Sequence, residues 1–174
     1  MIKSRSISSS WHKFVYLICM SLILLVLYIP VHAQEHPPKP IKVTTFQNLS
    51  FGAFFQGVAG GTVIIYPNGS RSVTGDIIQA SLGFSYFPAI FEVEANPGCL
   101  MIIQKGPDVL LTGSNGGSLT LHIGDTSPTS PFVNTFTPPG KTQVRVGATL
   151  LVGSPLANPV GSYSGTFLIT FIQQ

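Results

Sequence analysis

The stretch from Leu49 to Gly75 restricts the possible fold more than any other part of the chain. Two runs rich in β-branched residues, Thr62–Tyr66 and Arg71–Gly75, flank the dipeptide Asn68-Gly69. Asn and Gly both adopt the positive φ that a two-residue type I′ turn requires, and Asn-Gly between such runs is the strongest short-range hairpin signal. The segment therefore predicts an antiparallel β-hairpin whose register is set by Asn68 and Gly69.

The rest of the chain continues the same pattern of short strands and turns. Strand-like segments are expected at Ile41–Phe46, Leu49–Phe54, Thr62–Tyr66, Arg71–Gly75, Ile77–Leu82, Ala89–Ala95, Cys99–Gln104, Val109–Thr112, Ser118–Ile123, Thr142–Val152 and Ser162–Ile172. Turn residues separate most of them, and the chain contains 18 Gly and 14 Pro. Many short strands with regular turn signals predict an antiparallel sandwich or barrel. Outside the N-terminal leader, no long run has helical periodicity.

The N-terminus has the pattern of a secretory signal peptide. Lys3, Arg5 and Lys13 form a basic head, Phe14–Val31 is almost continuously apolar, and Ala33 ends a small-residue exit motif. This pattern predicts a helical signal peptide at 1–33, cleaved after Ala33, and export to the periplasm, the cell surface or the medium. The alternative is an uncleaved membrane anchor, because the apolar run approaches the roughly 20 residues that span a bilayer. Any membrane contact is expected through this segment alone.

Removing the leader changes the charge balance. Three of the nine Lys and Arg residues lie within it, which leaves six basic and six acidic residues beyond Ala33. The pI of about 9.0 therefore belongs to the leader and does not indicate a nucleic-acid partner. Residues 34–40 predict a Pro-rich tether, and residues 41–174 a single domain. Cys99 is the only cysteine beyond the leader, so hydrophobic packing must hold the domain together without an internal disulfide.

The last strand-like segment alternates most cleanly. Its aromatic and apolar residues fall on one face, at Tyr163, Gly165, Phe167, Ile169 and Phe171. Because successive side chains of a strand point to opposite sides, this face is expected in the core and the other face half exposed. In contrast, Gly124–Pro139 is rich in Ser, Thr and Pro and predicts a long surface excursion.

These residues resemble a known family. Leu-Ser-Phe-Gly-Ala-Phe at 49–54, the run from Gly60 through Gly75, and the closing Gly-Ser-Tyr-Ser-Gly-Thr-Phe at 161–167 resemble the secreted bacterial family named domain of unknown function 4402. That family is in turn similar to sandwiches of the spore-coat and archaic fimbrial pilin kind. The resemblance implies an all-β, antiparallel immunoglobulin-like or pilin-like sandwich, and it brings no catalytic residues with it.

A search for catalytic and metal-binding patterns favours a non-enzymatic protein. Gly161–Gly165 lacks the central Ser of a nucleophile elbow. Glu92 and Glu94 share one strand face, which would suit glycoside hydrolysis, but a solvated outer face explains them better. His122 is expected to be a half-exposed strand residue. One Cys and isolated His residues do not make a zinc site, so no catalytic residue, metal or cofactor is predicted.

Two functions remain open. The first is a structural or adhesive module, resembling pilin subunits, that joins other surface subunits by strand addition, with the tether and Ile41–Phe46 as the donor strand. The second is a module that binds a glycan or small ligand through loop aromatics, at Tyr86, Phe87, Phe132 or Phe136. The scaffold residues are expected to be Phe51, Gly52, Phe54, Gly60, Gly61, Asn68, Gly69, Tyr163, Phe167 and Phe171.

Overall fold

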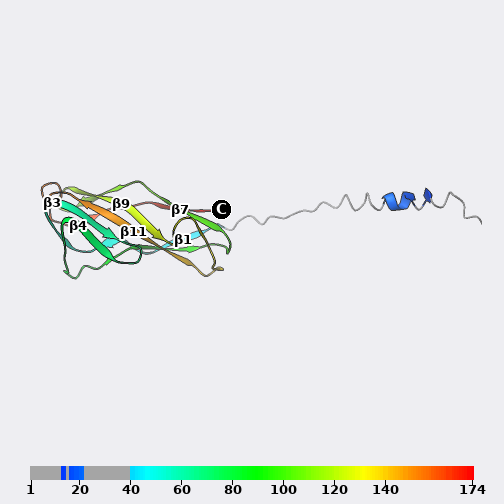
Figure 1. Ribbon diagram of the computed structural model, residues 1–174, viewed down its shortest axis with the longest axis horizontal. Helices are drawn as coiled ribbons and strands as arrows, with labels where there is room; N and C mark the ends of the chain where they lie inside the picture. Colours follow the sequence, from blue (N-terminus) through cyan, green and yellow to red (C-terminus); the bar gives the residue numbers. More distant parts are fainter. Residues whose placement is uncertain (1–12, 15, 22–39) are drawn as a thin grey trace, which may run out of the picture. The chain divides into compact units, whose positions relative to one another are not determined.

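The computed structural model describes residues 13–14, 16–21 and 40–174 (Figure 1). Residues 13–14 and 16–21 are helical, as the signal-helix prediction requires at these positions. Within the described residues, no helix has the length and apolar character needed to cross a membrane. The basic head at Lys3 and Arg5, the cleavage position at Ala33 and residues 34–39 of the tether lie outside the described residues. The chain divides into two units, residues 1–38 and 39–174.

The second unit consists of short antiparallel strands, which confirms the all-β prediction. The strands are β1 (Lys42–Gln47), β2 (Ser50–Phe51), β3 (Phe54–Ile65), β4 (Arg71–Gln79), β5 (Tyr86–Phe87), β6 (Ala89–Glu94), β7 (Leu100–Lys105), β8 (Val109–Gly113), β9 (Ser118–Ser127), β10 (Phe132–Val133), β11 (Thr142–Val152), β12 (Tyr163–Ser164) and β13 (Ile169–Gln173). They form one large and two small sheets, packed as a sandwich.

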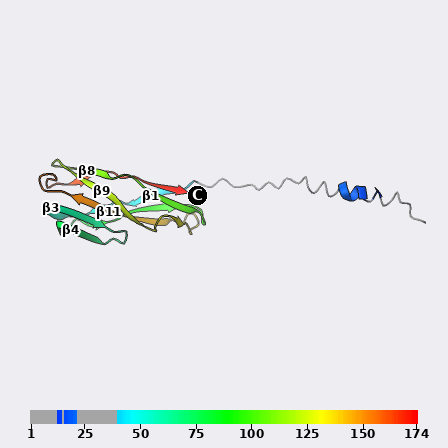
Figure 2. The same ribbon diagram turned by 45° about the horizontal axis from the view of Figure 1, so that its top comes forward.

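Strand β11 is the centre of the large sheet. The sheet has the order β1-β6-β11-β9-β8-β12, and β3 with β4 joins it along β11. One edge of β11 is shared between two partners: Thr142–Val146 pairs with β6, and Ala148–Val152 pairs with β3. Its other edge pairs with β9. Figures 1 and 2 show the β3–β4 hairpin at one end of the domain and β1 toward the other, beside the C-terminus.

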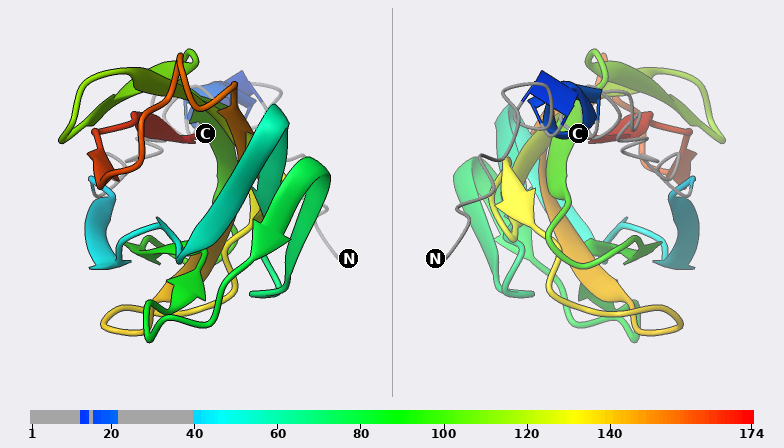
Figure 3. Two further views of the ribbon diagram at one scale, coloured as in Figure 1. Left: turned by 90° about the vertical axis from the view of Figure 1, so that its left-hand side faces the viewer. Right: turned by 90° about the vertical axis from the view of Figure 1, so that its right-hand side faces the viewer.

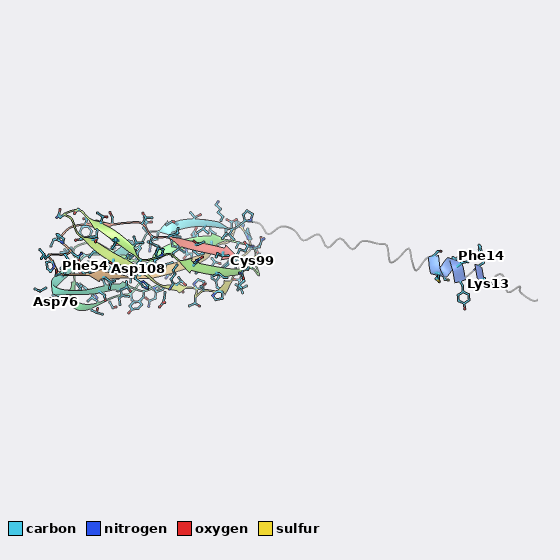
Figure 4. The ribbon with its side chains drawn as sticks, turned by 90° about the horizontal axis from the view of Figure 1, so that it is seen from above. Lys13, Phe14, Phe54, Asp76, Cys99 and Asp108 are labelled. Carbon is cyan, nitrogen blue, oxygen red and sulfur yellow. The ribbon has the colours of Figure 1, made fainter. Side chains whose placement is uncertain are left out.

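The second layer is smaller. It contains a three-stranded sheet of order β10-β7-β13 and a two-stranded sheet of β2 and β5. The core lies between the layers as two clusters, one of which includes Val63, Leu121 and Leu150, and the other Val93 and Val146. Figure 4 shows Phe54, which packs on the first cluster, at one end of the domain and Cys99 at the other. Phe167 packs against both clusters and joins them.

The predicted hairpin is present, but its turn differs from the prediction. β3 pairs with β4 in register around Tyr66–Ser70, and the N–H of Gly69 donates to the carbonyl of Tyr66 at 2.9 Å. Gly69 has a φ of 88°, whereas no other residue type in the described chain has a positive φ. Pro67 fixes its own φ near −65° and so favours a type I turn over Pro67-Asn68, followed by Gly69 in the left-handed region. The type I′ prediction, with Asn68 also left-handed, is therefore wrong.

The closing strand is divided between the two layers. Tyr163–Ser164 pairs with β8 in the large sheet, and Ile169–Gln173 pairs with β7 in the small one. The expected single strand at 162–172 is thus wrong, because the chain changes sheets at residues 165–168. The predicted face is confirmed at Tyr163, Phe167, Ile169 and Phe171, which are half-buried between exposed neighbours, but it is wrong at Gly165, which is exposed where the chain changes sheets.

Two further boundaries differ from the prediction. β4 runs continuously through Gly75, which lies opposite Gly61 beside a bulge, so the expected break there does not occur. The Gly124–Pro139 region is less of a surface excursion than expected, since β9 extends to Ser127 and β10 follows. Asn134 in this region is buried, and its amide donates to the carbonyls of Ala95, Asn96 and Phe136. This one side chain binds three backbone carbonyls and fixes the loop.

Candidate functional site

The outer edge of β13 is an unpaired strand edge in the described domain. β13 pairs only with β7, which lies on its other side. Leu100 and Gln174 exchange both backbone hydrogen bonds, and Gly106 donates to the carbonyl of Leu168. Because bonding alternates along an antiparallel pair, the even-numbered residues face β7. Ile169, Phe171 and Gln173 therefore direct their N–H and C=O groups toward the free edge.

Strand β1 is the matching edge of the large sheet, and its inner face is uncovered. Among the described strands, β1 pairs only with β6, with Val43 opposite Val93. Residues directly opposite in a ladder lie on the same face of the sheet. Val93 is 0% exposed, but Val43 is 40% exposed. The second layer therefore covers β6 and stops before β1.

The aromatic contacts between the layers place the two free edges on the same side. The ring of Phe91, on β6, lies 5.8 Å from that of Phe171 and 6.4 Å from that of Phe167, centroid to centroid. β13 thus lies opposite β6, and β1 is the next strand outward from β6. Both views of Figure 3 show β1 (cyan) and β13 (red) on one side of the domain. A strand added to the free edge of β13 would lie over β1 and cover Val43.

The composition of β13 leaves this edge unprotected. Edge strands usually carry Lys, Pro or inward-pointing charges that prevent pairing with another chain. β13 reads Ile-Thr-Phe-Ile-Gln and contains neither a charge nor a proline. Leu168 and Ile172 are exposed on its outer face, so both the backbone and the side chains of this strand favour an added partner.

The two ion pairs of the described chain lie on exposed faces of the large sheet. Lys141 Nζ is 2.7 Å from Glu92 Oε2. The hydrogen bond and charge of Lys141 lower the pKa of Glu92, and Glu92 in turn raises the pKa of Lys141. His122 Nδ1 is 2.7 Å from Asp108 Oδ1 in a second exposed pair. Within the residues that the structure describes, no group of three or more His, Cys, Asp and Glu side chains is arranged to hold a metal ion.

The expected donor strand is already in use within this chain. Lys42–Gln47 pairs with β6 of its own domain, so Ile41–Phe46 is not a free arm in this structure. Its attachment is nevertheless light, because residues 42–46 are all exposed and only Gln47 is half-buried. The Gln47 amide also donates to the carbonyl of Pro88 at 2.8 Å.

The predicted loop aromatics do not form one site. Tyr86 and Phe87 form β5, directly before β6, and the guanidinium of Arg71 stacks on the Tyr86 ring at 4.3 Å. Phe132 packs against the core, and Phe136 lies beside Asn134, whose amide also bonds Ala95 just after β6. The two pairs therefore lie at opposite ends of β6, about 20 Å apart along the strand. A ligand site at one pair or the other stays a prediction, and the two pairs do not combine into a single site.

The scaffold residues fall largely where the sequence pattern placed them. Phe51 and Phe54 pack on the first core cluster, together with Tyr163. Gly52 and Gly60 have φ values of 67° and 68°. The free edge of β13 was missed, because a strand's pattern shows which residues face the core and not which edge lacks a partner. Its lack of charge and proline is the one sequence signal that pointed to it.

The chain was also compared with known proteins. No curated protein and no solved structure matches it. A family model described as Domain of unknown function (DUF4402) matches residues 41–172, which is nearly the whole of the β-sandwich unit. The match covers the hairpin, the Phe-Gly element and the closing Tyr-Phe segment, and it extends over well more than half of the sequence. The chain therefore belongs to the DUF4402 family.

Proposed function

We propose that this protein is an exported, non-enzymatic structural or adhesive subunit, resembling pilin subunits, that assembles by strand addition at β13. The single observation that supports it best is the unpaired edge of β13, which among the described strands pairs only with β7 and carries neither a charge nor a proline. Such an edge suits an added strand from another chain. The leader supports export.

The incoming strand in this proposal is the 41–46 segment of a second copy. It follows the Pro-rich tether in the sequence, which gives it reach. Residues 42–46 are exposed, so within this segment only Ile41 gives up a core contact when the strand leaves β6. Such a contact joins two different surfaces, β1 of one copy and β13 of the next. Heterologous contacts of this kind build open filaments unless the rotation closes a ring.

The test is the assembly state of the full chain, measured by light scattering over a range of concentrations. Gln173→Pro removes an N–H that faces the free edge, and Thr170→Lys places a charge beside it. We expect wild-type oligomers and predominantly monomeric variants. Thr112→Lys, on β8 between two partners, is the matched control and should assemble like the wild type.

The proposal fails if the wild-type chain stays monomeric at every concentration. It also fails if both edge variants assemble as the wild type does. Deletion of residues 34–47 identifies the donor: assembly should be lost while the domain stays folded by circular dichroism. Assembly that survives this deletion would rule out the 41–46 segment as the donor.

A further inference from the structure

The outer face of the large sheet has two adjoining hollows beside Gly147. The larger is about 630 Å³ and is lined by Tyr66, Pro67, Asn68, Ser127, Pro128, Gln143 and Arg145. The second is about 320 Å³, shares Tyr66 and Pro67, and reaches His122, Asp125 and Thr149. Gln143 and Arg145 alternate with the buried Val144 and Val146, so the hollow lies on the face of β11 away from the core.

The hollow exists because β11 changes partner at Gly147. β6 pairs with β11 as far as Val146, and β3 starts at Ala148, so the tip of the β3–β4 hairpin meets β11 at this gap. A Cβ on Gly147 would lie 2.5 Å from the Ile65 carbonyl oxygen and 2.9 Å from Pro67 Cδ. Only glycine admits this approach. The hairpin tip therefore forms one wall, Ser127-Pro128 another, and Gln143 and Arg145 the floor.

Arg145 has no ionic partner in the described part of the chain. The ion pairs there are His122–Asp108 and Lys141–Glu92. Arg71 behaves differently: its guanidinium donates to the carbonyls of Phe51 and Ala53, and it stacks on Tyr86. Arg71 is thus committed to the fold, whereas the exposed guanidinium of Arg145 is free for a ligand.

The side chains around Arg145 have the chemistry of a saccharide site. Tyr66 offers a half-exposed ring that can stack on the apolar face of a sugar. Asn68 Oδ1 accepts from the N–H and hydroxyl of Ser70, which leaves its amide nitrogen free. Gln143 and Ser127 add exposed hydrogen-bonding groups for hydroxyls. The planar guanidinium of Arg145 matches a carboxylate with two parallel hydrogen bonds.

We propose that this hollow binds a carboxylated saccharide, with Arg145 bound to the carboxylate and Tyr66 stacked on the ring. This site lies on the opposite face of the sheet from the layer that contains β13. It is therefore independent of strand addition, and each is tested without the other.

Calorimetric titration of the full chain with a galacturonic acid trisaccharide tests the proposal, with maltotriose as the neutral probe. We expect binding of the acidic trisaccharide only. Arg145→Ala should weaken it about tenfold to a hundredfold, since hydrogen bonds to charged groups are the strong ones. Arg145→Lys keeps the positive charge but loses the two parallel N–H donors of the guanidinium. Its affinity should therefore lie between those of the wild type and Arg145→Ala. Lys105→Ala removes an exposed cation on β7, outside the hollow, and should bind as the wild type does.

Three results would overturn the proposal. The first is no binding of the acidic trisaccharide at millimolar concentration. The second is equal affinity of the wild type and Arg145→Ala, each shown to be folded by circular dichroism. The third is equally tight binding of a tri-aspartate peptide, which would assign the hollow to acidic peptides instead. Light scattering of Arg145→Ala should show unchanged assembly, which separates this site from the β13 edge.

Discussion

Strands β11 and β1 belong to the same sheet but have opposite surroundings. β11 is paired along both edges, and its residues Val144, Val146, Ala148 and Leu150 are buried. β1 is paired along one edge, and the side chains from Lys42 to Phe46 are exposed on both faces. Val43 and Thr45 alternate along one face of β1 as Val144 and Val146 do along β11, so β-branched residues on that face do not explain the difference.

The difference comes from the size of the second layer. Three short strands, β10, β7 and β13, cover the middle of the large sheet near β6 and end before β1. Val93 on β6 is therefore buried, while Val43, opposite it on β1, is exposed. The covered part of the large sheet at β6 and the uncovered part at β1 differ by one strand of the second layer. An added strand in that position is the basis of the proposed assembly.

The sharpest test of the comparison uses two adjacent leucines of β11. Leu150 is 2% exposed and faces the core, whereas Leu151 is 46% exposed on the outer face. Leu150→Ala should lower the free energy of unfolding by about 2–5 kcal/mol, because it leaves a cavity. Leu151→Ala should change it by less than about 0.5 kcal/mol, as typical surface substitutions do. Urea denaturation measures both free energies of unfolding. Similar losses for the two variants would mean that the second layer does not bury the inner face of β11.

A smaller effect distinguishes β6 from β1. Val93→Ala should lower the free energy of unfolding by about 1–3 kcal/mol, because the lost methyl groups are fully buried. Val43→Ala, at the opposite position, should lower it by less than about 1 kcal/mol in monomeric protein. Once the chain assembles, the Val43 substitution should weaken the oligomer. A loss at Val43 as large as at Val93 in the monomer would show that β1 is already covered.

Much of the fold could be predicted from local alternation. The inward faces of β11 and of the closing segment follow from the period-two pattern at Val144, Val146, Phe167 and Phe171. Local competition caused one error, since Pro67 imposes a type I turn where Asn68-Gly69 alone favours type I′. The division of the closing strand is not local: it depends on β7 and β8 offering edges in different sheets.

The candidate site was harder to predict than the fold. Whether a strand has an unpaired edge depends on where the other strands lie in the fold. The residue pattern within Ile169–Gln173 does not contain that information. The exposure of Val43 depends likewise on where β13 ends in space. Tyr86 and Phe136 are equivalent candidates in the sequence, and only the fold shows that they lie at the two ends of β6. Arg145 is an outward-facing residue of β11, and only the fold brings Tyr66, Pro67 and Asn68 of the hairpin tip beside it.

The smallest expected effect concerns charge on the outer face, where Lys141 pairs with Glu92 at the β11 side of β6. Lys42 lies opposite Glu94 at the β1 side and forms no ion pair within the described residues. Because Lys141 lowers the pKa of Glu92 in the folded state, the pair stabilises the fold above the ordinary Glu pKa and loses this effect as pH falls. Lys141→Met should therefore flatten the decline in unfolding free energy between about pH 6 and pH 3, and Lys42→Met should leave it unchanged. Urea denaturation at each pH measures the slopes, and equal slopes for wild type and Lys141→Met would mean that the β11 side is as solvent-screened as β1.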